Sequence, residues 1–136
     1  MIWRPVNEVT DAMTVTSYRD LSVWQIGMDL AAAAYKLTGA FPTHEKYGLA
    51  SQLQRAAVSI PANIAEGHAK DSTKQYLFHV SVAMGSVAEA ETHLLLSERL
   101  GYATKDRVAS ALELCDQIGR MLHNLQKTLK AKLESH

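Results

Sequence analysis

Polar side chains recur at helical spacing between Ser51 and Gly67. They include amides, a guanidinium, a hydroxyl and a carboxylate, groups that can bind a polar ligand or join in a hydrogen-bonded network. The series is Gln52, Arg55, Ser59, Asn63 and Glu66. At 100° per residue, it occupies one side of a helix, about 120° from an apolar stripe. Three interpretations are compatible with it: a structural network in which Arg55 meets Glu89, a ligand site, or a solvated face.

Histidine and cysteine are the other reactive residue types, with six and one in the chain. Glu89 and His93 lie four residues apart on one helical face, but the paired Glu-x-x-His motifs of di-iron bundles are absent. Ser59 and Ser86 lie within helical pattern, without the sharp turn that exposes a nucleophilic serine. We therefore predict no catalytic residue, no metal site, no cofactor and no enzymatic activity.

The composition argues against several classes of protein. Lys plus Arg and Asp plus Glu number 14 each, so nucleic-acid binding would need a local patch. The single cysteine, Cys115, excludes an intrachain disulfide, and no apolar run approaches the roughly 20 residues that span a bilayer. We expect a cytoplasmic protein without a membrane partner.

The elements that position these residues are long helices. Periodic apolar positions and few prolines or glycines predict an all-α, antiparallel, up-down-up-down four-helix bundle. The expected helices are 20–38, 43–68, 72–99 and 104–133, with Asp20, Thr43, Ser72 and Thr104 as N-caps. Gln75 completes a capping box with Ser72. Residues 1–17 lack a period and are expected to form a flexible arm, in which Met13 is an alternative start.

Pro61 lies inside the second expected helix, where a proline costs about 3 kcal/mol. The apolar stripe keeps its phase across Pro61, which favours one long helix over two short ones. Ser59 or Asn63 could then pair with the loosened backbone. The third face of this helix is mostly small and apolar, and we expect another subunit to cover it. That face is Ala50, Gln54, Val58, Pro61 and Ala65. In the third helix, Gly85 suggests close approach of another helix.

The C-terminal segment is rich in cations, with Glu134 as its one acid. These cations are Arg120, Lys127, Lys130 and Lys132. They either complement the helix dipole or, repeated around a ring, form a cationic rim for phosphate contacts.

Three blocks closely resemble the four-helix-bundle family encoded in intervening sequences of bacterial 23S ribosomal RNA genes. These blocks are "YRDLSVWQ", "FPTHEKYGLASQLQRAAVSIPANIAEG" and "AMGSVAEAETHL". The resemblance implies a small cytoplasmic bacterial protein that assembles as a homopentamer, without an established catalytic activity. The chain is also similar in fold to the accessory protein of diversity-generating retroelements, which is strongly basic where this chain is neutral. The family's motif positions correspond here to Gln52, Arg55, Ser59, Asn63, Glu66, Gly67, Gly85, Ser86 and Glu89.

The predicted function is that of a non-enzymatic oligomer, joined through its first two helices, that binds structured RNA or another nucleic acid. The alternative is a structural oligomer that binds a protein partner and has no role with nucleic acid. A third hypothesis is a pore lined by Arg55, His79 and Glu89 that holds a small anion.

Overall fold

The computed structural model describes residues 17–135, and within this range the chain is all α-helical, with no strand. The elements are η1 (Tyr18–Asp20), α2 (Ser22–Thr38), η2 (Thr43–Glu45), α3 (Leu49–Ala69), α4 (Thr73–Arg99) and α5 (Lys105–Glu134). The four α-helices confirm that the fold is all-α with four helices, as predicted. Most of the expected arm, including Met13, lies outside the described residues.

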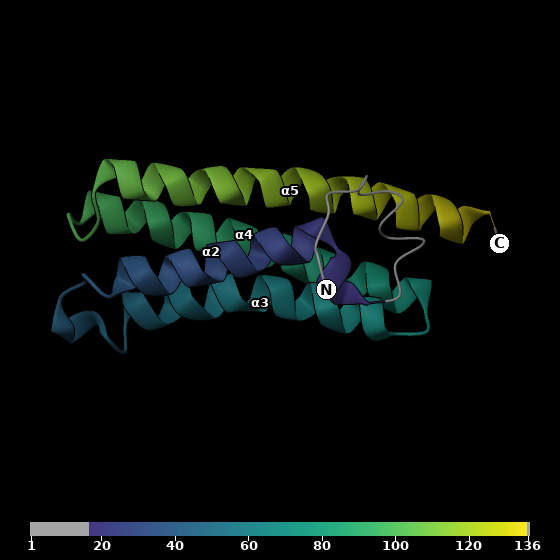
Figure 1. The fold of residues 1–136 in the computed structure, drawn as a ribbon, viewed down its shortest axis with the longest axis horizontal. Helices are drawn as coiled ribbons and strands as arrows, with labels where there is room; N and C mark the ends of the chain where they lie inside the picture. Colours follow the sequence, from purple (N-terminus) through teal and green to yellow (C-terminus); the bar gives the residue numbers. More distant parts are fainter. Residues whose placement is uncertain (1–16, 136) are drawn as a thin grey trace.

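The four long helices lie lengthwise beside one another, and successive connections lie at alternating ends (Figure 1). Helix α3 packs against α2 and α4, and α5 closes the arrangement by packing against α4 and α2. Each helix therefore has two neighbours and one outward side.

The core is built from apolar residues spaced three and four apart. In α5 these are Val108, Ala111, Cys115, Ile118, Leu122, Leu125 and Leu129. Each large side chain removed from water contributes about 1.5 to 3 kcal/mol. Burial also raises the pKa of the Cys115 thiol to about 12, so this group is an uncharged part of the core, as the sequence indicates.

Two of the four expected caps are present. The Ser72 hydroxyl accepts the Gln75 N–H at 3.2 Å, and the Thr104 hydroxyl accepts the Arg107 N–H at 3.3 Å. These bonds satisfy amide groups that have no partner within the first turn of a helix. Helices α4 and α5 therefore begin where the sequence predicts.

The other two predicted caps are wrong, because short 3₁₀ turns precede the helices. Asp20 ends η1, and α2 begins at Ser22 without a side-chain cap. Thr43 begins η2, and α3 begins only at Leu49.

Glu45 performs the capping role for α3 from a position before the helix. Its Oε1 accepts the Leu49 N–H at 3.1 Å, and its Oε2 accepts the Tyr102 hydroxyl at 2.9 Å. The hydrogen bond from the Leu49 N–H is the largest cause that lowers the pKa of Glu45, and the bond from the Tyr102 hydroxyl is the second. The bond between Tyr102 and Glu45 also raises the pKa of Tyr102. One carboxylate thus ties the start of α3 to the α4–α5 connection.

Helix α3 runs without a break through Pro61, which confirms the prediction of one long helix. Pro61 is buried, and a Cβ built on Gly27 of α2 would lie 3.3 Å from its Cβ. Ala50 is buried as well. The expectation that another subunit covers the whole third face of α3 is therefore wrong for Ala50 and Pro61, since the chain itself covers them.

Helices α3 and α4 lie in tight contact at Gly67. A Cβ at this position would lie 2.8 Å from the Cβ of His79 and 3.0 Å from Cδ1 of Tyr76. We predict that Gly67→Ala lowers the free energy of unfolding by about 1 to 3 kcal/mol, because α4 must move. Urea denaturation measures this change.

The matched control is Gly119→Ala, since no atom of residues 17–135 lies within 4 Å of a Cβ built there. Alanine at that helical position should stabilise the protein by up to about 1 kcal/mol. Equal effects of the two substitutions would contradict the proposed tight contact.

Candidate functional site

A continuous set of hydrogen bonds joins α3 to α4. The Ser59 and Ser86 hydroxyls lie 2.8 Å apart, and Asn63 Nδ2 donates to Ser59 Oγ at 3.1 Å. His79 Nδ1 lies 3.0 Å from Asn63 Oδ1 and 3.4 Å from Glu66 Oε2. We call these five residues the α3–α4 polar chain.

The geometry indicates which ring nitrogen of His79 carries the hydrogen. Because Asn63 donates through Nδ2, its Oδ1 can only accept, so the hydrogen lies on His79 Nδ1. In the neutral ring, Nε2 is then the unprotonated nitrogen. The His79 ring bonds to Asn63 and Glu66 and not to Ser59 or Ser86, so no serine in this polar chain is positioned for activation by histidine. The arrangement suits a polar contact between two helices.

Asn63 also bonds to the α3 backbone beside Pro61. Its Nδ2 donates to the Ser59 carbonyl at 2.8 Å, within a turn of the proline. Asn63 therefore bonds to the backbone near Pro61, as predicted, but its partner is not the Ala57 carbonyl, which is the group that lacks a donor from Pro61. One side chain thus supports α3 and links it to α4.

The structure brings only part of the predicted polar stripe together. Gln52, Arg55 and Glu89 are exposed, and no ion pair joins Arg55 to Glu89 among the described residues. The predicted buried pairing of Arg55 is therefore wrong within the chain. Arg55 lies on the outward side of α3 and lines a hollow together with Tyr35.

Sequence reasoning did not place His79 and Ser86 in a network with Asn63, although the family resemblance includes Ser86 among the motif positions. It considered His79 only as a lining residue of a pore, whereas its side chain is 13% exposed and contacts Asn63 and Glu66. A usable signal existed, because His79 and Ser86 are seven residues apart and so share a face of α4. Within one chain His79 is committed to Asn63 and Glu66, and so does not form a common site with Arg55 and Glu89.

The predicted cationic segment lies at the end of α5, which extends beyond the other helices in Figure 1. Lys127, Lys130 and Lys132 are exposed, and none forms an ion pair within the described range. Arg120 differs, since it pairs with Asp116 at 2.8 Å one turn earlier. The three lysines are therefore free to bind an anion, whereas Arg120 is already partly neutralised.

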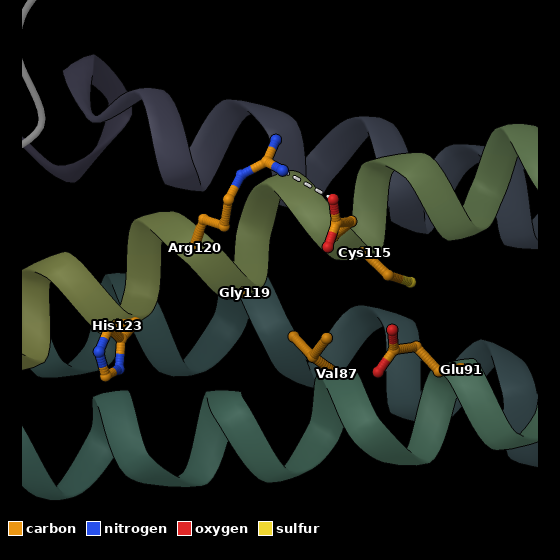
Figure 2. Close-up of a pocket in the computed structure, with 7 residues that line it drawn as sticks. Val87, Glu91, Cys115, Gly119, Arg120 and His123 are labelled. Atoms are coloured by element: carbon orange, nitrogen blue, oxygen red, sulfur yellow. Dashed lines mark hydrogen bonds and ion pairs between the residues drawn. The ribbon is translucent and has the colours of Figure 1, made fainter.

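A hollow of about 290 Å³ lies between α4 and α5 beside Gly119. Figure 2 shows Val87 and Glu91 directed from α4 toward α5, while Arg120 points away from them. The Cys115 thiol in its wall is uncharged because burial raises its pKa to about 12, so it lacks the thiolate needed for nucleophilic attack. Among residues 17–135, no group of three His, Cys, Asp or Glu side chains is placed to hold a metal.

None of the described helices is both long and apolar enough to cross a bilayer.

Asn63 makes the most contacts in the polar chain, so its removal should be the costliest. We predict that Asn63→Ala lowers the free energy of unfolding by about 1 to 3 kcal/mol, because His79 Nδ1 and Ser59 both lose a partner. Gln52→Ala, on the exposed side of the same helix, should change it by less than about 0.5 kcal/mol. Chemical denaturation compares the two, and an Asn63→Ala variant as stable as the control would refute the role of the polar chain.

A solved structure resembles this helical bundle with a TM-score of 0.70 and 23% sequence identity. The aligned region covers 77% of this chain and 98% of the chain in that structure. It is a protein of unknown function from the S23 ribosomal protein family of Bacteroides thetaiotaomicron VPI-5482, and at this identity it supports the fold alone. No curated protein matches. A sequence model of the 23S rRNA-intervening sequence protein family matches residues 19–124, and the chain belongs to that family.

Proposed function

We propose that this protein is a non-enzymatic, RNA-associated oligomer of antiparallel up-down-up-down bundles. The single observation that carries the RNA role is the extended end of α5, where three lysines are exposed and form no ion pair with the described part of the chain. Family membership also supports an RNA role, since the family takes its description from 23S rRNA intervening sequences. Phosphate groups are the chemistry that such a cationic helix end fits.

The contribution of one α5 end is small, because the chain as a whole has 14 cationic and 14 acidic residues. Three exposed lysines give only weak, salt-sensitive binding. Repetition in a ring raises the effective concentration of each further contact once the first has formed. RNA binding and oligomerisation are therefore coupled in this proposal.

The outward side of α4 is the surface that supports assembly. Its residues follow the alternating spacing of three and four that is typical of a coiled-coil seam. They are Phe78, Ser81, Gly85, Ala88, Thr92 and Leu95. Phe78 is 63% exposed and Leu95 is 53% exposed, although the opposite side of α4 already packs into the core. We call this surface the α4 seam.

Gly85 adds a steric reason for contact with a second copy. The sequence suggests close helix approach at this glycine, yet nothing in the described part of its own chain lies within 4 Å of a Cβ built there. A helix of another subunit could approach closely at this point. The proposal thus moves the assembly contact from α2 and α3 to α4, with the homopentamer implied by the family resemblance as the expected ring.

The RNA role predicts a strong effect of charge reversal at the α5 end. A labelled RNA hairpin should bind more weakly at about 200 mM than at about 50 mM salt, because each phosphate contact releases counterions. Lys127→Glu, Lys130→Glu and Lys132→Glu together should reduce affinity at least tenfold at the lower salt concentration. Fluorescence anisotropy measures both effects.

The control has the same change in net charge at the other end of the bundle: Lys36→Glu, Arg99→Glu and Lys105→Glu. It should retain more affinity than the α5 variant if position matters. Equal losses would show that only net charge counts. Absence of binding at low salt, with the oligomer intact, would favour the second candidate function.

That second candidate is a scaffold that binds a protein partner and no nucleic acid. The exposed apolar side chains of the α4 seam favour it, because a partner helix could pack there in place of a second copy. Such docking would change little with salt.

Assembly through α4 makes a separate prediction. Ala88→Glu places a charge in the α4 seam and should reduce the mass measured by light scattering from that of an oligomer to that of one chain. Ala109→Glu, on an exposed position of α5, should leave the mass unchanged. Loss of the oligomer in Ala62→Glu on α3, but not in Ala88→Glu, would return the interface to α2 and α3.

A further inference from the structure

A groove follows the outward side of α2 and α3, away from the α4 seam. Two adjoining hollows, of about 490 and 390 Å³, share Tyr35, Ser51 and Gln54 in their walls. One extends toward Tyr47 and the other toward Ser59. Together they form one continuous surface, which we call the α2–α3 groove. Along α3 it runs from Ala50 to Ser59, roughly 14 Å at 1.5 Å per residue.

Two tyrosines line this groove with their rings largely in solvent. Tyr47 is 88% exposed and Tyr35 is 54% exposed. Rings of this size usually bury more of their surface. The Lys46 ammonium lies 5.5 Å from the centre of the Tyr47 ring, so a cation accompanies the outermost aromatic face.

The charge of the α2–α3 groove is of one sign. Lys46 lines one hollow and Arg55 the other, and no carboxylate is among the residues that line either. Glu45 immediately precedes Lys46 in sequence, but its carboxylate accepts hydrogen bonds from the Leu49 N–H and the Tyr102 hydroxyl and does not line the groove. The groove therefore complements an anion along its length.

Neutral polar groups complete the walls in a fixed arrangement. Gln54 Nε2 donates to Thr38 Oγ1 at 2.9 Å, and this hydroxyl donates to the Tyr35 carbonyl at 3.1 Å. These bonds hold the Gln54 amide beside the Tyr35 backbone. Ser51 lines both hollows. Such groups pair with sugar hydroxyls and phosphate oxygens without reading the base.

From this combination we propose that the α2–α3 groove binds a short single-stranded segment of RNA, with bases stacked on Tyr35 and Tyr47 and phosphates beside Lys46 and Arg55. Duplex RNA does not fit these rings, because its bases are already stacked on one another. Aromatic platforms and a cationic groove are the usual means of binding unpaired strands. The inference rests on the proposed association with RNA, and adds a second contact of different chemistry.

The test uses a fluorescein-labelled oligouridylate of eight nucleotides and the intact protein at about 50 mM salt. Tyr47→Ala and Tyr35→Ala should each weaken binding about tenfold, within the range measured for loss of one stacked base. Tyr47→Phe and Tyr35→Phe should restore most of the affinity, because phenylalanine keeps the ring. Lys46→Gln should weaken binding more than Lys105→Gln, an exposed lysine outside the groove.

A labelled hairpin with a short loop, measured in parallel, separates this inference from the proposed function. Reversal of the three α5 lysines should weaken hairpin binding while Tyr47→Ala still weakens oligouridylate binding. Binding of the hairpin alone, or tyrosine variants equal to the wild type, would overturn the groove and leave the α5 role standing. Absence of binding to both probes would overturn both proposals. Should Tyr35→Ala fail to fold by circular dichroism, Tyr47→Ala still decides, since its ring is almost entirely in solvent.

Discussion

The passage of α3 through Pro61 is the constraint on which the rest of the bundle depends. The proline removes one backbone donor, at a cost of about 3 kcal/mol in a helix interior. Burial of Pro61 against Gly27 on one side offsets part of this cost, and on the other side the Asn63 hydrogen bonds tie the same part of α3 to α4. Helix α3 is thereby held between α2 and α4 around Pro61.

This fixed position of α3 determines which surfaces remain free. Because Ser59, Asn63 and Glu66 turn toward α4, Arg55 is left on the outward side, where it lines the α2–α3 groove. Helix α4 is committed to the core on one side yet carries apolar residues on the other. Helix α5 extends past its neighbours and ends in exposed lysines. Three outward surfaces of distinct chemistry therefore arise from one arrangement: a polar aromatic groove, an apolar seam and a cationic end.

Much of the fold follows from local sequence. Apolar residues at spacings of three and four identify the four helices, and the Ser72 and Thr104 caps are local enough to be recognised. The starts of α2 and α3 could not be predicted as easily. Both are preceded by 3₁₀ turns, and Glu45, which caps α3 by accepting the Leu49 N–H, is itself held by the hydroxyl of Tyr102, 57 residues away.

The positions of the polar residues could likewise be predicted only in part from the sequence. The helical period places Ser59, Asn63 and Glu66 on one face, and they do share a site. It also groups Arg55 with them, but a helical face is broad, and only packing decides which of its edges meets the next helix. Which of Arg55 or His79 becomes buried depends on the rotation of α3 against α4, set by Gly67 and by Gly27 opposite Pro61.

Ultraviolet cross-linking of the protein to a hairpin with a single-stranded loop, followed by peptide mass spectrometry, tests the central claim of RNA association most directly. We expect cross-links in peptides from the end of α5 and in those that contain Tyr35 or Tyr47, and none on the α4 seam. Cross-links confined to α4, or their absence at low salt from an intact oligomer, would contradict an RNA-associated role.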